Sequence, residues 1–426
     1  MILERLDLRG TTEHLDRVLP RPPGVGESVH DDVAKILARV RRDGDEAVRE
    51  FTARFDGVTL DELRVAPDEL AAAVERVPAP VRVALEVAYG RIFAYHAQEG
   101  SPPEDWRADG VTVRHLVRPV ARAGCYVPGG RARYPSTVLM CAAPAHVAGV
   151  GEVVLCVPPG RDGSVDDATL AAAAVAGVDE LYRIGGAQAI GAMAYGTATI
   201  ERVDVIVGPG NRYVAEAMRQ VSGTVGVPAA FAGPSEVVVV AGPDTDPELA
   251  AIDIVVQAEH GPDGLAWLVT WSAEVLEAVS ATVDRLVAAS PRRAELESTL
   301  RSGGRACLVG DPAAALAVAN AIAPEHLELL FEGAADYLPL VQAAGAVFLG
   351  PWSPASLGDY IAGPNHVLPT NRSARFASAL RADDFRRHIH AVEADRAGVE
   401  RLGPHAIALA EVEGLAAHAE SLRIRL

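Results

Sequence analysis

From Gly151 onward, the sequence alternates short runs of β-branched residues with longer alanine-rich stretches. The first series reads EVVLCV, DATLAAAAVAGV, ELYRIGG, AQAIGAMAYG, VDVIVGPGN and RYVAEAMRQV. Short apolar runs separated by segments of helix length are typical of βαβ units, whose parallel strands are covered by helices on both faces. A second series of the same kind begins at SEVVVVAG and ends at GAVFLG, residues 345–350. The pattern therefore predicts an α/β protein with two parallel-sheet domains.

The ends of the chain have a different pattern. Residues 30–55 place apolar side chains three to four positions apart, which indicates an amphipathic helix. We expect residues 1–125 to be helical and to pack with residues 236–378, the first Rossmann-like domain. Residues 126–235 are expected to form the second Rossmann-like domain. Residues 379–426 form a C-terminal tail, which must pack on its own domain or on a partner subunit to be ordered.

Composition and charge exclude several classes of function. The 57 acidic residues outnumber the 39 basic ones, and the net charge of −18 repels nucleic acid and anionic membranes. The four cysteines form no CxxC pair, which argues against a disulfide scaffold and a thiolate zinc site. The N-terminus has no apolar signal region, and no apolar run has the length of a membrane span. We expect a cytoplasmic protein that acts on a small molecule.

Three glycine-rich turns are candidates for nucleotide binding. Residues 208–211 (GPGN) and 185–188 (GGAQ) each follow a predicted strand and open a predicted helix, so their backbone amides can face an anion. Neither turn has the complete GxGxxG pattern, and a simple strand-to-helix connection explains each of them equally well. Residues 124–130 (GCYVPGG) place Tyr126 in a rigid turn, where its ring can lie over a flat cofactor or where the turn can serve as a domain hinge.

Several polar clusters offer metal and acid/base chemistry. Gln257 and His260 lie three residues apart on a predicted helix, so one metal ion can reach both side chains, although such a pair is more often a polar helix edge. Glu325 and His326 are adjacent and point in different directions, which suits two separate proton-handling roles. Asp359 is predicted to lie, with His366, in an irregular polar loop.

The remaining candidates are weaker when considered alone. Glu413 and His418 are five residues apart on the tail. Residues at this spacing do not share one face of a helix unless the helix breaks at Gly414. Ser235 follows Gly233 and Pro234, and turn chemistry by itself accounts for that motif.

Taken together, these segments resemble the histidinol dehydrogenase family. The matching stretches follow the family's order over nearly the whole chain and read YVPGGRARYPSTVLM, RIGGAQAIGAMAYGT, VDVIVGPGNRYV, AGPSEVVVVA, QAEHGPDG, APEHLEL, GDYIAGPNHVLPT and EGLAAH. The resemblance implies a zinc-dependent enzyme of histidine biosynthesis. Such an enzyme oxidises L-histidinol through L-histidinal to L-histidine and reduces two NAD.

The resemblance also implies a role for individual residues. The catalytic pair is Glu325 and His326. The NAD contacts are Tyr126, Gln188 and Asn211, and the zinc ligands are Gln257, His260, Asp359 and His418. The substrate contacts are Ser235, Gln257, His260, His326, Asp359, Glu413 and His418. In the family the C-terminal segment crosses to the neighbouring subunit, so Glu413 and His418 are expected to complete the partner's site in a homodimer.

Some positions depart from the family pattern. Met218 stands where lysine is usual, and Gly264-Leu265-Ala266 stands where Ser-Gln is common. The segment before AGPSE reads VPAAF in place of an Ile-Asp-Met type of sequence. These departures leave two alternatives: a dehydrogenase of the same family for another small alcohol, such as a sulfonated diol, and a zinc hydrolase in which Glu325 activates water. The glycine-rich turns favour a dinucleotide and disfavour the hydrolase. Glu413 disfavours an anionic substrate because like charges repel.

Overall fold

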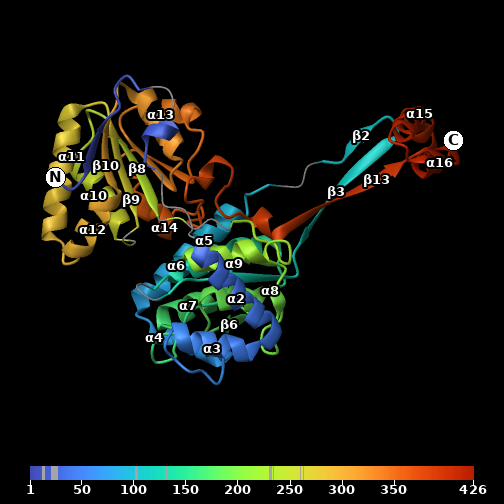
Figure 1. The fold of residues 1–426 in the computed structure, drawn as a ribbon, viewed down its shortest axis with the longest axis horizontal. Coiled ribbons are helices and arrows are strands. Elements are labelled where there is room, and N and C mark those ends of the chain that lie inside the picture. Colours follow the sequence, from blue (N-terminus) through green and yellow to red (C-terminus); the bar gives the residue numbers. More distant parts are fainter. Residues whose placement is uncertain are drawn as a thin grey trace.

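The computed structural model describes residues 1–11, 15–20, 27–100, 104–129, 133–229, 233, 235–259, 261 and 263–426. These residues form two parallel sheets, each covered by helices on both faces, and an arm that projects away from both (Figure 1). The expected fold class is confirmed, because each sheet is parallel throughout its described strands.

The larger sheet has six strands in the order β1-β10-β9-β8-β11-β12. Their bounds are Glu4–Asp7 (β1), Glu236–Ala241 (β8), Leu265–Thr270 (β9), Gly304–Leu308 (β10), His326–Leu330 (β11) and Ala346–Leu349 (β12). The run of valines from 237 to 240 is buried on both faces of the sheet, as expected for a central parallel strand.

Helices cover both faces of this sheet. One face packs against α10 (Pro247–Ala258), α11 (Ala273–Ala289) and α12 (Arg293–Gly303). The other packs against α1 (Leu15–Val18), α13 (Pro312–Ile322) and the 3-10 helix η1 (Ala334–Leu340). A short helix, α14 (Ala355–Tyr360), follows β12.

The smaller sheet has four strands in the order β6-β5-β4-β7. Their bounds are Arg122–Tyr126 (β4), Glu152–Cys156 (β5), Glu180–Tyr182 (β6) and Val205–Val207 (β7). One face packs against α4 (Pro67–Arg76), α5 (Ala79–His96), α6 (Pro135–Ala148) and α7 (Asp167–Ala176). The other packs against α2 (Glu27–Asp43), α3 (Asp45–Phe55), α8 (Gly186–Tyr195) and α9 (Arg212–Val221).

The structure corrects the expected partner of the N-terminal helices. Residues 1–125 were expected to pack with residues 236–378, but α2 to α5 pack on the smaller sheet, and β4 of that sheet begins at Arg122. Within the described part of the N-terminal segment, β1 and α1 are the elements that join the larger domain. An amphipathic pattern shows that a helix face is buried, but it does not specify which sheet buries it.

The arm consists of antiparallel strands followed by two helices. Its sheet has the order β13-β3-β2, with β2 at Trp106–Ala108, β3 at Val111–Pro119 and β13 at Arg386–Ala394. The 3-10 helices η2 (Ser373–Arg375) and η3 (Ala382–Phe385) precede it, and α15 (Arg396–Val412) and α16 (Ala416–Arg423) lie at its tip (Figure 1).

The strand β13 was not expected, because the strand signal fades after Pro369. Its residues RRHIHAVEA are mostly exposed, so they lack the apolar run that marks a buried strand. Apolar side chains at the tip are also exposed, including Val412 at 90% and Leu409 at 66%. No helix in the described parts of the chain is long and apolar enough to span a membrane.

The amino edge of the smaller sheet depends on one arginine. Arg122 of β4 is nearly buried and forms ion pairs with Glu152 of β5 and Glu180 of β6. We expect Arg122→Ala to lower the free energy of unfolding by about 2 kcal/mol, because it removes the buried guanidinium whose charge-assisted hydrogen bonds join β4 to β5 and β6. Urea unfolding measures the change. Arg82→Ala is the control, since Arg82 pairs with the exposed Glu75 and should change stability by less than about 0.5 kcal/mol. Equal losses in the two variants would contradict this reading.

Candidate active site

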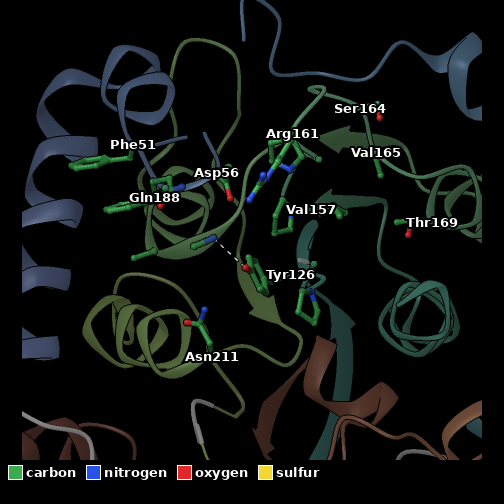
Figure 2. A pocket seen from close by; sticks show the side chains of 18 of the residues that line it. Phe51, Asp56, Tyr126, Val157, Arg161, Ser164, Val165, Thr169, Gln188 and Asn211 are labelled. Carbon is green, nitrogen blue, oxygen red and sulfur yellow. Dashed lines mark hydrogen bonds between the residues drawn. The ribbon is translucent and has the colours of Figure 1, made fainter. Parts of the chain in front are cut away.

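A cavity of about 1660 Å³ lies at the carboxyl edge of the smaller sheet (Figure 2). Residues that follow its strands line the cavity, among them Tyr126 at the end of β4, Val157 after β5, Gly186 after β6 and Asn211 after β7. Side chains of α2 and α3 form the opposite wall. Ligands of doubly wound sheets bind outside the carboxyl ends of the strands, so this cavity is placed where a nucleotide would bind.

The three residues expected to contact NAD all line this cavity. The Tyr126 hydroxyl accepts a hydrogen bond from the backbone N–H of Gly186 at 3.1 Å (Figure 2). Burial raises the pKa of Tyr126, so its hydroxyl stays protonated and can donate to a ligand. Gln188 is buried, and in the described part of the chain neither atom of its side-chain amide finds a hydrogen-bond partner.

Asn211 caps the helix that follows β7. Its Oδ1 accepts hydrogen bonds from the backbone N–H groups of Tyr213 and Val214 at 2.9 and 3.2 Å. The preceding turn requires glycine at position 208, where φ is +118° and a Cβ atom would lie 2.1 Å from the Tyr126 carbonyl oxygen. The turn motif thus brings Asn211 and Tyr126 to one cavity.

A second group of polar residues gathers at the amino edge of the larger sheet. Ser235 precedes β8, and Glu325 and His326 stand at the start of β11. Gln257 lies in the last turn of α10. Because α10 connects two neighbouring parallel strands, it runs back across the sheet and its C-terminal end returns to the amino edge. The topology therefore brings together residues that are far apart in the sequence.

His326 lies between two carboxylates. Its Nε2 is 3.3 Å from Oδ1 of Asp359, and its Nδ1 is 3.7 Å from Oε2 of Glu325. Burial by itself would lower the pKa of His326, but the charges of Glu325 and Asp359 outweigh burial and raise it to about 9. Burial raises the pKa of Glu325, although this carboxyl accepts hydrogen bonds from the Ser235 side chain and, at 3.1 Å, from the backbone N–H of Glu236.

Asp359 lies on the short helix α14, whereas an irregular loop was expected. His366 lies in the loop beyond it, and its Nδ1 donates to the backbone carbonyl of Asp359 at 2.7 Å. Gly358 allows α14 to approach β12, because a Cβ atom there would lie 2.5 Å from the ring of Phe348. That ring lies beside the imidazole of His326, with 5.9 Å between centroids. The contact of Gly358 with Phe348 thus fixes Asp359 relative to His326.

The expected metal ligands are distributed over the chain. Gln257 is buried, with no hydrogen-bond partner for Nε2 among the described residues, and His260 lies outside the described residues. Burial and the charge of Asp359 raise the pKa of Tyr360, and the charge of Glu259 adds to them, so the end of α10 lies near α14 and Asp359. His418 is exposed at the tip of the arm.

This donor set fits zinc only when it is complete. In the described ranges, no three His, Cys, Asp or Glu side chains lie together in a way that would hold a metal. The amide of Gln257, whose Nε2 lacks a partner among the described residues, together with a carboxylate and two imidazoles, nevertheless makes a mixed oxygen and nitrogen set that suits zinc. Glu413 lies with His418 on the arm, away from Gln257 and Asp359 in the same chain (Figure 1).

Sequence reasoning missed three carboxyl groups at this edge of the sheet. Glu236 begins β8, Glu328 lies within β11, and Asp253 faces β11 from α10. Burial, followed by the charge of Glu325, raises the pKa of Glu236 to about 8. The available signal was an acidic residue inside an otherwise apolar segment, as in HLELL and AAIDIVV.

The two sites define the class of protein. A cavity for a dinucleotide on one sheet and a buried acid/base pair on the other are the requirements of an NAD-dependent oxidoreductase. The family described as Histidinol dehydrogenase matches residues 20–426, and the chain belongs to this family. It is thus an oxidoreductase of histidine biosynthesis, as its resemblance to the family implied.

Similar proteins cover the full chain. A histidinol dehydrogenase from Gluconobacter oxydans (strain 621H) is 46% identical and covers 100% of this chain and 99% of its own. One from Aromatoleum aromaticum is 44% identical, with 100% and 98% covered. The crystal structure of histidinol dehydrogenase from Elizabethkingia anophelis is 34% identical, with a TM-score of 0.95 over 100% of this chain and 98% of that one.

The approach of α14 to β12 yields a test of the site geometry. Gly358→Ala should push α14 away from the Phe348 ring and move Asp359 relative to His326. A displacement of about 1 Å can cost on the order of 100-fold in rate, so we expect kcat/KM to fall by up to that factor. Steady-state kinetics measure it. Gly310→Ala is the control, because a Cβ atom there meets open space. Wild-type kinetics in Gly358→Ala would show that the close contact does not position Asp359.

Proposed function

We propose that this enzyme is a zinc-dependent histidinol dehydrogenase that oxidises L-histidinol through L-histidinal to L-histidine and reduces two NAD. The observation that carries the proposal is the position of His326, buried and held between Glu325 and Asp359 at the start of β11. The full-length relatives from Gluconobacter oxydans and Aromatoleum aromaticum support the same assignment, since each is named histidinol dehydrogenase.

In the proposed mechanism, His326 handles protons in both oxidations. Its imidazole removes the proton of the alcohol and later a proton of the aldehyde hydrate, and Glu325 helps water to add to the aldehyde. NAD, when bound, accepts the hydride in each step. Burial raises the pKa of Glu325, which makes its protonated form more accessible than that of an exposed carboxyl.

His326 must be neutral to act as a base. Its pKa of about 9 reflects the charge of Asp359 as well as that of Glu325. When the Asp359 carboxylate ligates a cation, its attraction for a proton on His326 is reduced. The ligand role of Asp359 and the base role of His326 are therefore compatible, and each makes the other more effective.

Zinc would be held by Gln257, His260 and Asp359 of one chain and by His418 of its partner. When bound, zinc orients the amine and imidazole of the substrate. Ser235 and Glu413 would contribute further substrate contacts, and Tyr126, Gln188 and Asn211 would hold NAD. The cavity around these last three residues has ample volume for a dinucleotide.

The arm supports a homodimer with shared active sites. It projects from both domains and exposes apolar side chains at its tip, including Leu409, Val412 and Ile424. Exposed apolar patches of this kind mark surfaces that another chain covers. Glu413 and His418 lie between these side chains in the sequence, so docking of the arm would carry them into the partner.

The reaction stoichiometry tests the proposed activity. Purified protein with zinc should form about two NADH per L-histidinol, because two consecutive two-electron oxidations are required. Absorbance at the NADH band measures the yield, and a chelator should abolish it. Protein that forms no NADH from histidinol overturns the proposal. Turnover of a sulfonated diol would then indicate the alternative family dehydrogenase, and hydrolysis without NAD would indicate the zinc hydrolase.

Mixing inactive variants tests the shared site. In a heterodimer of His418→Ala and His326→Ala chains, one site carries both substitutions and the other carries neither. Random exchange should therefore restore about a quarter of wild-type activity. The matched control mixes His326→Ala with Asp359→Ala, two residues of the same body, and should restore none. If subunits exchange and neither mixture regains activity, each site is made within one chain.

A further inference from the structure

Two acidic side chains face each other beneath the proposed zinc site. Glu328 of β11 is fully buried, and its carboxyl lies close enough to the half-buried carboxyl of Asp253 on α10 for the two to share a hydrogen bond. Two carboxyl groups can form a hydrogen bond only when one of them carries a proton. Burial raises the pKa of both groups, and burial together with the charge of Asp253 raises that of Glu328 to about 9. The protonated state that the pair requires is thus available at neutral pH.

Glu328 has a second partner on the opposite side. Its Oε1 accepts a hydrogen bond from the backbone N–H of Ala355 at 2.9 Å. Ala355 is the first residue of α14, where backbone N–H groups lack partners within the helix. One glutamate therefore joins three elements: its own strand β11, the helix α10 through Asp253, and the helix α14 through Ala355.

Each of these elements carries one residue of the proposed active site. Asp253 lies four residues before Gln257, on the same face of α10. Glu328 lies two residues after His326, on the same face of β11. Ala355 lies four residues before Asp359, one turn earlier on α14. Glu328 therefore links the same three elements that carry Gln257, His326 and Asp359. Each of its contacts lies one helical turn, or two residues along the strand, from one of these site residues.

We propose that Asp253 and Glu328 are positioning residues, which hold Gln257, His326 and Asp359 in the relative geometry that zinc and substrate require. The proposal rests on the function proposed above. It explains why this space holds a carboxyl pair, since apolar residues of similar volume would fill a buried space at equal or lower cost in stability. Apolar side chains would not fix the direction of three elements, whereas hydrogen bonds do.

The test separates positioning from stability. The double variant Asp253→Ala/Glu328→Met nearly conserves side-chain volume and leaves no unpaired buried charge, so its thermal midpoint should stay close to that of the wild type. We expect its zinc affinity, measured by competition with a chelator, to fall at least tenfold, as for other residues that orient metal ligands. Its kcat/KM for L-histidinol should fall by a similar factor, while NADH binding, measured by fluorescence, stays unchanged.

Glu328→Gln provides the rescue. Its amide can donate to Asp253 and accept from the N–H of Ala355, so zinc affinity and kcat/KM should stay within about threefold of wild type. Thr245→Val is the matched control, because buried Thr245 joins β8 to β11 at the opposite edge of the sheet through Gly242 and Leu330. This variant should lower stability without changing zinc affinity.

Three results would overturn the proposal. The first is a folded double variant with wild-type zinc affinity and kcat/KM. The second is a tenfold loss of zinc affinity in Glu328→Gln, a result that counts against the proposal even if the double variant does not fold. The third is an equal loss of zinc affinity in Thr245→Val. Wild-type protein that neither binds zinc nor oxidises histidinol would instead overturn the proposed function, and this inference with it.

Discussion

The removal of carboxylates from water is the constraint that shapes the active-site edge of the larger sheet. Moving an unpaired carboxylate into a protein interior costs several kcal/mol, so each one must be paired, hydrogen-bonded or protonated. Glu236, Glu325 and Glu328 are all buried along this edge, with Asp253 and Asp359 beside them. His326 is the cation that two of them share. The carboxylates of the cluster that remain ionised attract cations, which favours a divalent cation and an amine-bearing substrate over an anion.

The proposed cofactor cavity lies at the carboxyl edge of one sheet, whereas the acid/base pair lies at the amino edge of the other. The cavity around Tyr126 follows the common rule that ligands bind at the carboxyl ends of parallel strands. The acid/base pair lies at the amino end of β11 in the other sheet. Hydride transfer requires the two to meet, and Tyr134 at the start of α6 lies close enough to Tyr360 on α14 for their hydroxyl groups to interact electrostatically. Tyr134 also lines the cavity around Tyr126.

The strands and helices of both sheets could be predicted because their residues are buried on both faces. Val237 to Val240 and residues 153–156 (VVLC) have no polar face, and such apolar runs indicate a buried strand whatever surrounds them in the sequence. The exposed strand β13 lacked this signal, and the attachment of α2 to α5 to the smaller sheet depends on contacts distant in the sequence. The irregular motif around Asp359 concealed a six-residue helix, because Gly358 serves there as a packing residue and not as a helix breaker.

The site residues were predictable to different degrees for the same physical reason. Tyr126, Gln188 and Asn211 belong to turns whose glycines are required by local geometry, so the motif and its position agree. Glu325 and His326 were visible as an adjacent acid/base pair. Asp253 and Glu328 were missed because their proposed role depends on their contact with each other, and the two residues are 75 positions apart in the sequence. The family resemblance suggested the ligands, but only the structure shows which elements carry the residues proposed as ligands.

The arm connects metal binding with assembly. If His418 of one chain completes the zinc site of the other, then zinc binds the dimer more tightly than it binds the separated chains, and by linkage zinc stabilises the dimer. In that case the exposed Leu409 and Val412 of α15 would supply the apolar area that is buried when the arm docks. The neighbouring Glu413 and His418 would specify where on the partner subunit the arm docks. In the proposed dimer, the neighbouring subunit would cover these helices, and the helices would complete the active site of that subunit.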